Sequence, residues 1–461
     1  MVGTELVLSV EKAAAGGRML ARHDGQIVLV SGTIPGERVR ARVERAARSV
    51  LYAATIEVVE SSPDRRPVMG DWQCGGNVFA HIAYERQRLL KGDILRDALA
   101  RIGRVPLETA PGVIGSPEQG YRMRARLHCR GGRLGFFREG THELCDAGAT
   151  GQLLPGAVEW ITQAERLIAR AGVRGLSGVE LSENVAGDER ACHLLLDARV
   201  AAHPFVELGG LAGITGLSAE RADRTGIDIL SGTPSVTDVL RVGADDAAPV
   251  PGDIERPTLR LRRDVRAFFQ GNRFLLERLA RHVMSLVPPG PVVDLYAGVG
   301  LFGLSLAAVD YDDVTLVEGD PISGASLVEN AEPFGARVRV ERRSVESFLS
   351  VGPASNRTWG GSRGEARSRR AADPPTTYIV DPPRTGMSKE ALAGIERNAP
   401  DRLVYVSCDV ATFARDTRTL LDAGYELEQV SGMDLFPNTA HVEAIARFIR
   451  SAGPKGPAPQ M

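Results

Sequence analysis

Three side chains in the last quarter of the sequence are of types that carry out covalent and proton-transfer chemistry. Asp381 ends the apolar run TYIV and precedes two prolines, and Cys408 ends the apolar run RLVYVS. Both runs indicate buried strands, and the carboxyl ends of parallel strands meet at one sheet edge, where ligands bind. Glu443 follows in DLFPNTAHVE, at the start of the last apolar run. A thiol beside two carboxylates predicts a nucleophile with a nearby general base.

A glycine-rich turn precedes these residues. The segment VVDLYAGVGLFG has the pattern of a strand, a turn and a helix start, with Asp294 near the strand end and Gly298 and Gly300 in the turn. Glu318 closes the next apolar run, where an acidic side chain can accept both ribose hydroxyls. The pattern predicts an adenosyl cofactor and leaves both NAD and S-adenosylmethionine (SAM) open. Asp294 favours SAM, because a carboxylate attracts the amino group of its methionine part and repels a pyrophosphate.

The elements that must position these residues alternate along the C-terminal part of the chain. After about residue 270, apolar strand candidates are separated by helix-like stretches. This pattern predicts an α/β fold with a doubly wound, mostly parallel sheet. Residues 352–375 interrupt the pattern, since they are rich in Gly, Ser, Arg and Pro and nearly lack large apolar residues. They predict a disordered surface insertion, with RNA contact by its arginines as the less favoured reading.

The N-terminal half has a different pattern. Short alternating or β-branched runs within the first 60 residues predict a small β-barrel of the OB type. Residues 84–103 have the apolar spacing of one amphipathic helix. In residues 121–130 the side chains alternate, with apolar residues on one face and arginines and a histidine on the other. That polar face is either a solvated strand face or a stripe for RNA phosphates, and the sequence favours neither.

Composition excludes several classes of protein. The 461 residues carry a net charge of −2, so any nucleic acid must be held by local basic patches. Five scattered cysteines without a CxxC pair suggest neither a disulfide framework nor a structural zinc site. The N-terminus lacks the pattern of a signal peptide, and no stretch reaches the ~18 apolar residues of a membrane span. We therefore expect a cytoplasmic monomer with reduced thiols, no membrane partner and no bound metal.

Four segments in the C-terminal half, DLYAGVGLFGLSLA, DPPRTGMS, YVSCDVATFARD and DLFPNTAHVE, together resemble the RNA uracil-C5 methyltransferases. These are class I SAM-dependent enzymes, many with an N-terminal TRAM domain of OB-like fold, which HDGQIVLVSGTIPGERVRARV resembles. The resemblance implies a TRAM-like barrel over 1–62, a central mixed α/β domain over 63–255 and a Rossmann-like catalytic domain over 256–461.

The resemblance also implies roles for single residues. Cys408 corresponds to the nucleophile that adds to C6 of uracil, Glu443 to the base that removes the C5 proton, and Asp381 to a substrate-orienting group that also touches the cofactor. The other positions that correspond to SAM contacts are Gln270, Tyr296 and Glu318. A target base in paired RNA must first be flipped out. Since only a thiolate adds to the ring, we expect a polar, partly open setting for Cys408.

The sequence departs from the family where many members hold an iron–sulfur cluster on four cysteines. In RPVMGDWQCGGNVFAH, Cys74 is retained, whereas Val68 and Asn77 stand where the first and third cysteines would fall. Cys145 corresponds to the fourth. Two thiolates cannot hold a cluster that needs four. We therefore predict a degenerate cluster segment at 68–77 and no iron–sulfur cluster.

Further departures bear on the cofactor and the substrate. Leu301 replaces a commonly polar residue, and Ser344 stands where an acidic residue often contacts the adenine side. Arg384 occupies the position where cytosine-C5 enzymes have a second cysteine and amino-group methyltransferases an aromatic residue, which disfavours both. Two competing hypotheses are an RNA-binding protein with a decayed methyltransferase domain and an NAD-dependent oxidoreductase. The TRAM-like domain favours ribosomal RNA of the 23S type over tRNA.

Overall fold

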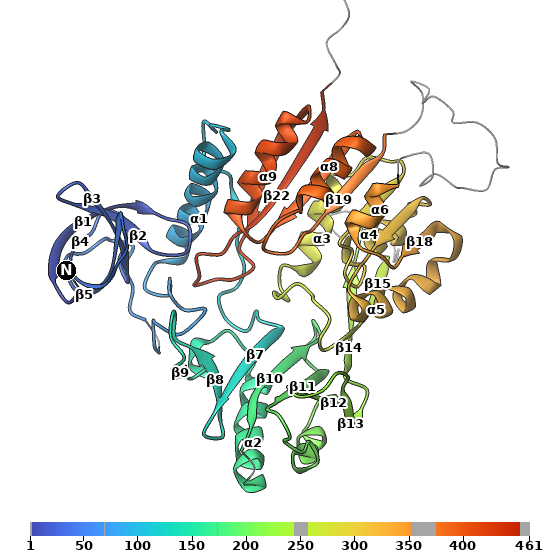
Figure 1. The fold of residues 1–461 in the computed structure, drawn as a ribbon, viewed down its shortest axis with the longest axis horizontal. Coiled ribbons are helices and arrows are strands. Elements are labelled where there is room, and N and C mark those ends of the chain that lie inside the picture. Colours follow the sequence, from blue (N-terminus) through green and yellow to red (C-terminus); the bar gives the residue numbers. More distant parts are fainter. Residues whose placement is uncertain (1, 69, 173, 244–256, 352–374, 452–461) are drawn as a thin grey trace, which may run out of the picture.

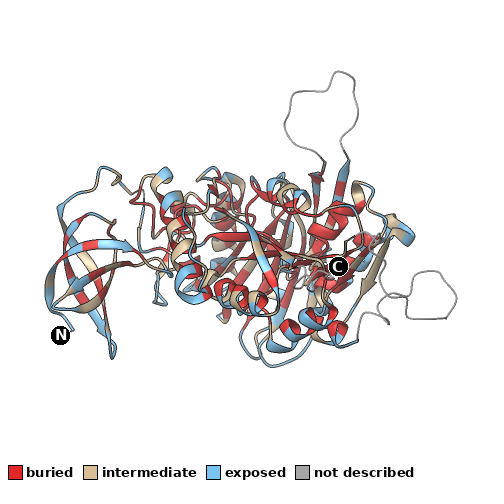
Figure 2. Ribbon diagram, turned by 90° about the horizontal axis from the view of Figure 1, so that it is seen from above, coloured by how far each residue is buried: buried red, intermediate tan, exposed pale blue. Residues whose placement is uncertain are grey.

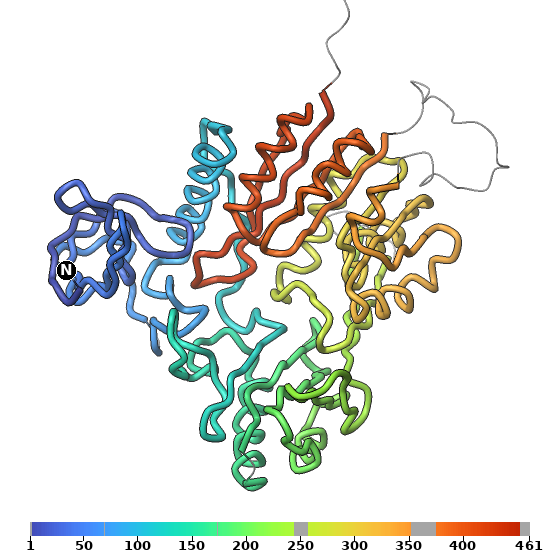
Figure 3. Tube along the Cα trace, in the orientation of Figure 1, coloured from blue at the N-terminus to red at the C-terminus, as the bar shows by residue number. Residues whose placement is uncertain are grey.

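The computed structural model describes residues 2–68, 70–172, 174–243, 257–351 and 375–451. The chain forms an N-terminal barrel, then a sheet built by its middle part, and then a larger sheet that holds most of the C-terminal part (Figure 1). Figure 3 shows the same path as a tube, with the barrel at one end of the molecule. Residues 352–374, nearly all of the insertion predicted at 352–375, lie outside the described residues.

The barrel confirms the OB-type prediction for the N-terminal part. Its strands close in the order β1-β2-β3-β5-β4. They are β1 (Glu5–Ala13), β2 (Met19–His23), β3 (Gln26–Ser31), β4 (Arg38–Ala46) and β5 (Val50–Glu60). In β4 the side chains alternate, so that Val39, Ala41 and Val43 fill the interior while the arginines between them face outward. Closure leaves no exposed edge along the barrel.

The middle part of the chain builds a second, mostly antiparallel sheet. In the described ranges its order is β13-β12-β11-β10-β7-β8-β9. The strands are β7 (Arg124–Arg130), β8 (Arg133–Phe137), β9 (Leu144–Cys145), β10 (Leu176–Glu183), β11 (Arg190–Leu196), β12 (Ile214–Arg221) and β13 (Asp228–Gly232). Helix α2 (Pro155–Ala171) covers one face and buries Trp160 and Ile161. The alternation predicted for residues 121–130 is present in β7, whose apolar side chains are buried.

The third sheet is Rossmann-like, as predicted. Its order among the described residues is β18-β17-β16-β19-β20-β22-β21-β6. The strands are β6 (Val113–Ile114), β16 (Val292–Leu295), β17 (Val314–Val317), β18 (Val338–Glu341), β19 (Thr377–Val380), β20 (Arg402–Ser407), β21 (Tyr425–Met433) and β22 (Glu443–Arg450). Strands β16 to β20 are parallel and β22 is antiparallel to β20. The order reverses between β16 and β19, which places the ligand crevice at their carboxyl ends.

Helices cover both faces of this sheet. One face packs against α3 (Leu276–Ser285), α4 (Leu301–Ala308) and α5 (Pro321–Ala331), and the other against α6 (Val345–Ser350), α8 (Lys389–Asn398) and α9 (Val410–Asp422). Figure 2 shows the central strands as buried and the outer sides of the helices as exposed. A hairpin of β14 (Ser235–Arg241) and β15 (Thr258–Asp264) precedes the sheet.

Helix α1 (Tyr84–Ala98) lies between the barrel and the third sheet (Figure 1). It contacts β1 of the barrel and α9 of the sheet, and it continues as a π-helical turn to Gly103. The short strand β6 then pairs with β21 at the sheet edge. Both elements precede the second sheet in the chain, yet they pack with the third. None of the helices in the described ranges has the length and apolar character that crossing a bilayer requires.

One disulfide contradicts the expectation of reduced thiols. Cys74 and Cys145 are bonded, although they lie 71 residues apart, with 5.7 Å between their Cα atoms. The loop around Cys74 runs along β8, where the Gly75 amide donates to the Phe137 carbonyl at 2.9 Å. Strand β9, which contains Cys145, pairs with β8 and so meets this loop. Because folding around β8 brings these two distant segments together, the spacing of cysteines in the sequence gives no sign of the bond.

Candidate active site

The glycine turn after β16 has one open side and one packed side. Gly298 has a φ of 58°, and a Cβ atom there would meet nothing within 4 Å. Gly300 has a φ of 103°, and a Cβ atom there would lie 2.5 Å from Leu304 Cδ1. Glycine is therefore needed at Gly300 to pack the turn onto α4. The open side at Gly298 is where a ligand can approach the backbone closely.

Glu318 is held beside this turn at the end of β17. Its Oε2 accepts from the Gly298 amide at 2.7 Å and its Oε1 from the Asp320 amide at 2.6 Å. Burial raises the pKa of its carboxyl, although these amide hydrogen bonds act in the opposite direction. Each carboxylate oxygen has two lone pairs, so Glu318 retains acceptor capacity for ribose hydroxyls.

Asp294 has a structural role that the sequence did not reveal. The side chain is fully buried in β16, and its Oδ2 accepts from the Gly303 amide in the first turn of α4 at 2.8 Å. Its Oδ1 has no hydrogen-bond partner among the described residues. Burial raises the pKa of this carboxyl to about 8. The unpartnered oxygen suits a positively charged donor, and contact with the amino group of SAM stays a prediction.

Tyr296 and Ser344 lie beyond the carboxyl ends of β16 and β18. Tyr296 follows β16 with a φ of 60°, and its ring packs on the apolar cluster around Val317 and Val380. Ser344 caps α6, because its Oγ accepts from the Ser347 amide at 3.2 Å. The serine that departs from the family pattern therefore begins a helix. An open glycine turn, a fixed carboxylate and an unpartnered buried oxygen together fit SAM.

Cys408 lies between the end of β20 and the start of α9. Asp409 caps this helix, since its Oδ1 accepts from the amides of Ala411 and Thr412 at 3.1 and 2.9 Å. The thiol is partly exposed, as expected. Its pKa is raised to about 11, chiefly by burial and also by the negative charges of Glu443 and Asp381, while Arg384 acts in the opposite direction. The setting therefore does not favour the thiolate, and the resting thiol is protonated at neutral pH.

Asp381 follows β19, the strand between β16 and β20, so it lies between the glycine turn and the thiol. Gln270 donates through Nε2 to Asp381 Oδ2 at 3.1 Å. Burial raises the pKa of Asp381, and the bond from Gln270 opposes this shift. The structure thus brings together two residues that are 111 positions apart and that the sequence assigned to the cofactor.

Glu443 is placed opposite Cys408 by the register of the sheet. Ser407 of β20 pairs with Ala444 of β22 in an antiparallel ladder, so the next positions outward are Cys408 and Glu443. The carboxyl is buried, and its Oε1 has no partner in the described part of the chain. Burial raises its pKa well above the ordinary value, Asp381 adds to this shift and Arg384 opposes it. A buried carboxyl facing a thiol is suited to proton transfer.

The loop before Glu443 is anchored by α1, which the sequence did not reveal. Lys91 donates to Asp434 Oδ1 at 2.5 Å, with both side chains fully buried, and to the Phe436 carbonyl at 3.1 Å. Gln87 and Asn438 exchange two hydrogen bonds of 2.9 Å. Gln87 and Lys91 are four residues apart on the apolar face of the helix. Polar residues on that face were the available signal.

The thiol opens into a cleft of about 510 Å³ that all three parts of the chain line. The barrel contributes Gly16, the loop next to the disulfide contributes Gly76, and the second sheet contributes Arg126 and Phe136. No group of three or more His, Cys, Asp or Glu side chains in the described ranges could hold a metal ion. The absence of an iron–sulfur cluster stays a prediction.

An OB-type barrel, a Rossmann-like sheet with a glycine turn and a thiol at the sheet edge define a TRAM-containing class I methyltransferase. Family models agree, since residues 1–56 match the TRAM domain and residues 259–450 match tRNA (Uracil-5-)-methyltransferase. Two relatives are named 23S rRNA (uracil(1939)-C(5))-methyltransferase. That of Pseudomonas entomophila is 30% identical over 97% of this chain and 94% of its own, and that of Alkalilimnicola ehrlichii is 32% identical over 95% and 94%. The chain therefore belongs to the RNA uracil-C5 methyltransferase family, as its motifs indicate.

A solved structure supports the fold over nearly the whole chain. It is the tRNA (uracil-54, C5)-methyltransferase of Pyrococcus abyssi, in complex with S-adenosyl-L-homocysteine. It aligns with a TM-score of 0.70 and 22% identity, covering 96% of this chain and 99% of its own. The similarity shows that the barrel and both sheets are arranged alike in the two proteins.

Proposed function

We propose that this protein transfers a methyl group from SAM to C5 of a uridine in structured RNA, through a covalent bond between Cys408 and C6. The pairing of β20 with β22 carries the proposal, because it places Cys408 opposite Glu443 next to Asp381. Family membership supports the reaction class. The covalent step is inferred from the chemistry of the site.

The residues account for each bond that changes. C5 of uracil is a poor nucleophile until the Cys408 sulfur adds to C6 and moves an electron pair toward C5 and O4. One carboxylate, that of Asp381 or of Glu443, takes the thiol proton and passes it to solvent, which leaves Glu443 ionised for the later step. Bound SAM supplies an electrophilic methyl group at C5. Glu443 then takes the C5 proton, and the electrons of the C5–H bond expel the sulfur from C6.

The raised pKa values of the carboxyls make the first proton transfer less costly. A carboxyl of ordinary pKa would accept a proton from a thiol of pKa about 11 only at a cost of about 9 kcal/mol. Burial raises the pKa of Glu443 and Asp381 as well as that of Cys408, so the gap between donor and acceptor is smaller.

The test replaces the nucleophile and traps its adduct. Cys408→Ala should abolish tritium transfer from labelled SAM to RNA, whereas Cys129→Ala, which removes a free buried thiol of the second sheet, should not. A transcript with 5-fluorouridine at the target blocks proton removal and should stay bound to wild-type enzyme through Cys408. Undiminished methylation by Cys408→Ala would refute the covalent route.

We further propose that the RNA is 23S-type ribosomal RNA, because relatives so named align over 95–97% of the chain. The competing substrate is tRNA, which the family model and the Pyrococcus abyssi enzyme name. Mapping 5-methyluridine in both RNAs, from cells with and without the gene, separates the two.

The cytoplasm remains our predicted location for this reaction. We also propose that the protein acts as a monomer, because a single chain supplies every part of the cleft. Light scattering tests this.

A further inference from the structure

A second cavity, larger than the cleft at Cys408, lies on the sheet of the middle part. Its volume is about 890 Å³. One wall is formed by the outer face of β7 and the end of β8, and the other by the end of α2 and the start of β10. Arg126, His128 and Phe137 line both this cavity and the Cys408 cleft. We call the second cavity the β7 groove. It continues the cleft along the sheet.

An aromatic platform stands where the two cavities meet. The rings of His128 and Phe137 stack with centroids 3.6 Å apart and an angle of 9° between their planes, and His142 packs edge-on against Phe137 at 5.3 Å. Burial lowers the pKa of His128, and Arg126 and Arg130 lower it further. The imidazole is therefore neutral at physiological pH and offers a flat ring more than a charge. Flat rings beside a cleft are the surfaces on which unpaired bases stack.

Of the three arginines in the β7 groove, Arg126 lies 4.0 Å from Glu180, and the other two differ from the arginines of barrel strand β4. On the barrel, Arg38, Arg40 and Arg42 each lie within ion-pair distance of a glutamate. Arg130 and Arg174 of the β7 groove have no ion-pair partner among the described residues, and both are exposed. Unpaired arginines around an aromatic platform complement a chain that alternates phosphates and bases.

We propose that the β7 groove binds unpaired nucleotides of the RNA that flank the target uridine, with bases on the His128–Phe137 stack and phosphates at Arg126, Arg130 and Arg174. The inference rests on the proposed function, because it takes the occupant of the Cys408 cleft to be RNA. It answers the question that the sequence left open for residues 121–130. Their polar face holds phosphates and bases as well as meeting solvent.

The first test removes charge from the groove alone. Arg130 and Arg174 line the β7 groove and not the Cys408 cleft. Each phosphate contact on single-stranded RNA contributes about 0.7 to the slope of log affinity against log salt. Arg130→Gln/Arg174→Gln should reduce that slope by about 1.4 on a transcript with a single-stranded flank, and should weaken binding about tenfold at low salt. A short oligonucleotide that carries little beyond the target uridine should lose no affinity.

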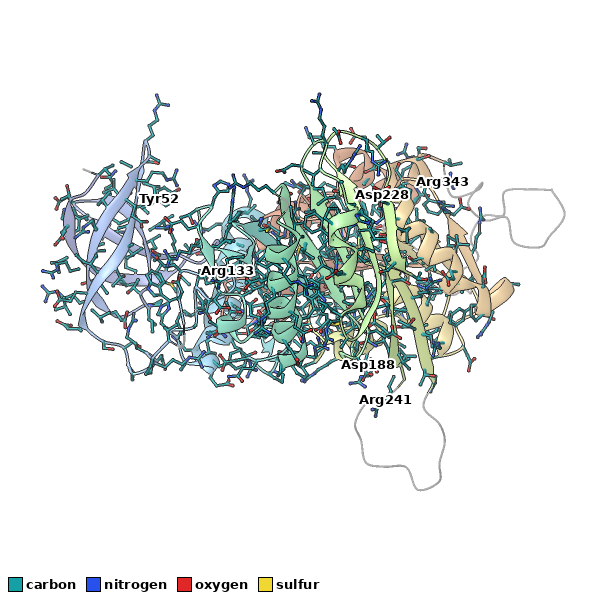
Figure 4. The ribbon with its side chains drawn as sticks, turned by 90° about the horizontal axis from the view of Figure 1, so that it is seen from below. Tyr52, Arg133, Asp188, Asp228, Arg241 and Arg343 are labelled. Carbon is teal, nitrogen blue, oxygen red and sulfur yellow. A yellow bond between two sulfur atoms is a disulfide. The ribbon has the colours of Figure 1, made fainter. Side chains whose placement is uncertain are left out.

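Arg133→Gln is the matched control. Arg133, which is labelled in Figure 4, begins β8. It is ion-paired with Glu165 and does not line the groove. This variant should keep the wild-type salt slope. Binding of SAM, measured by calorimetry, should be equal in all three proteins and confirms that they are folded.

The second test determines whether bases of the RNA lie on the His128–Phe137 stack. Transcripts carrying 5-iodouridine at single positions on either side of the target should crosslink to His128 or Phe137 peptides, and His128→Ala should reduce that crosslinking. Equal affinity of wild type and Arg130→Gln/Arg174→Gln for the flanked transcript would overturn the inference, and would favour a protein as the occupant of the groove. Methylation of that transcript by wild type separates this result from failure of the proposed function, in which no RNA is methylated.

Discussion

The protonation state of Cys408 gives the sharpest prediction. Its pKa is raised to about 11, so at pH 8 only about one thiol in 1,000 is ionised. Because the thiolate is the reactive form, alkylation of Cys408 by iodoacetamide should rise tenfold for each pH unit between 7 and 10. The whole range corresponds to a factor of about 1,000.

Removing the charge of Arg384 tests this prediction, because Arg384 is the cation that favours the thiolate of Cys408. Arg384→Met removes this charge and leaves the two carboxyls that oppose ionisation. The pKa of Cys408 should rise further, and each unit of increase lowers the alkylation rate at a given pH tenfold. The profile should keep its slope and shift toward higher pH.

The assay follows the Cys408 peptide by mass spectrometry at a series of pH values, with glutathione as the reference thiol. The peptides of Cys129 and Cys192 are internal controls, because both thiols are buried and should react more slowly. If the alkylation rate of Cys408 in wild type no longer rose above pH 8, the raised pKa would be refuted. A variant profile that coincides with that of wild type would refute the effect of Arg384.

Three further predictions concern the parts that support the site. Lys91→Met leaves the buried Asp434 without its cation and should cost about 3–5 kcal/mol of stability in urea unfolding; a loss below 1 kcal/mol would contradict the buried pair. Cys145→Ser removes a cross-link that spans 71 residues and should cost about 4 kcal/mol in the chain-entropy model. A reducing agent should lower the melting temperature of wild type but not of that variant. Gly298→Ala puts a methyl group on the open side of the turn and a side chain at a φ of 58°. Calorimetry should show weakened SAM binding, with a stability loss of only about 1–2 kcal/mol.

The sequence predicts well where the strand-end residues lie, because local pattern and topology determine their positions together; their roles stay a prediction. Apolar runs mark β16, β17, β19 and β20, and a doubly wound order brings their carboxyl ends to one edge. Glu318, Asp381 and Cys408 follow from this rule alone. The closing antiparallel strand adds Glu443 by its register with β20.

Contacts between distant segments could not be predicted in the same way. Lys91 and Asp434 are 343 residues apart, and Cys74 and Cys145 are joined across β8. No periodicity within either segment encodes such a pair. The raised pKa of Cys408 could not be predicted from the sequence either, because it depends on burial and on three charged neighbours that come together only in the folded chain.

Some of these distant contacts show that residues before the Rossmann-like sheet help to position Glu443. Glu443 can face Cys408 only if the loop before β22 keeps its shape, and Lys91, Gln87 and Tyr121 hold that loop through Asp434, Asn438 and the Pro437 carbonyl. All three anchors precede residue 256, where the family resemblance predicts the start of the catalytic domain. Without them Asp434 would be a buried carboxylate with no cation, which is costly enough to change the loop. The segment between the barrel and the second sheet therefore supports the proposed active site, and the proposed base, Glu443, is positioned by residues more than 300 positions before it.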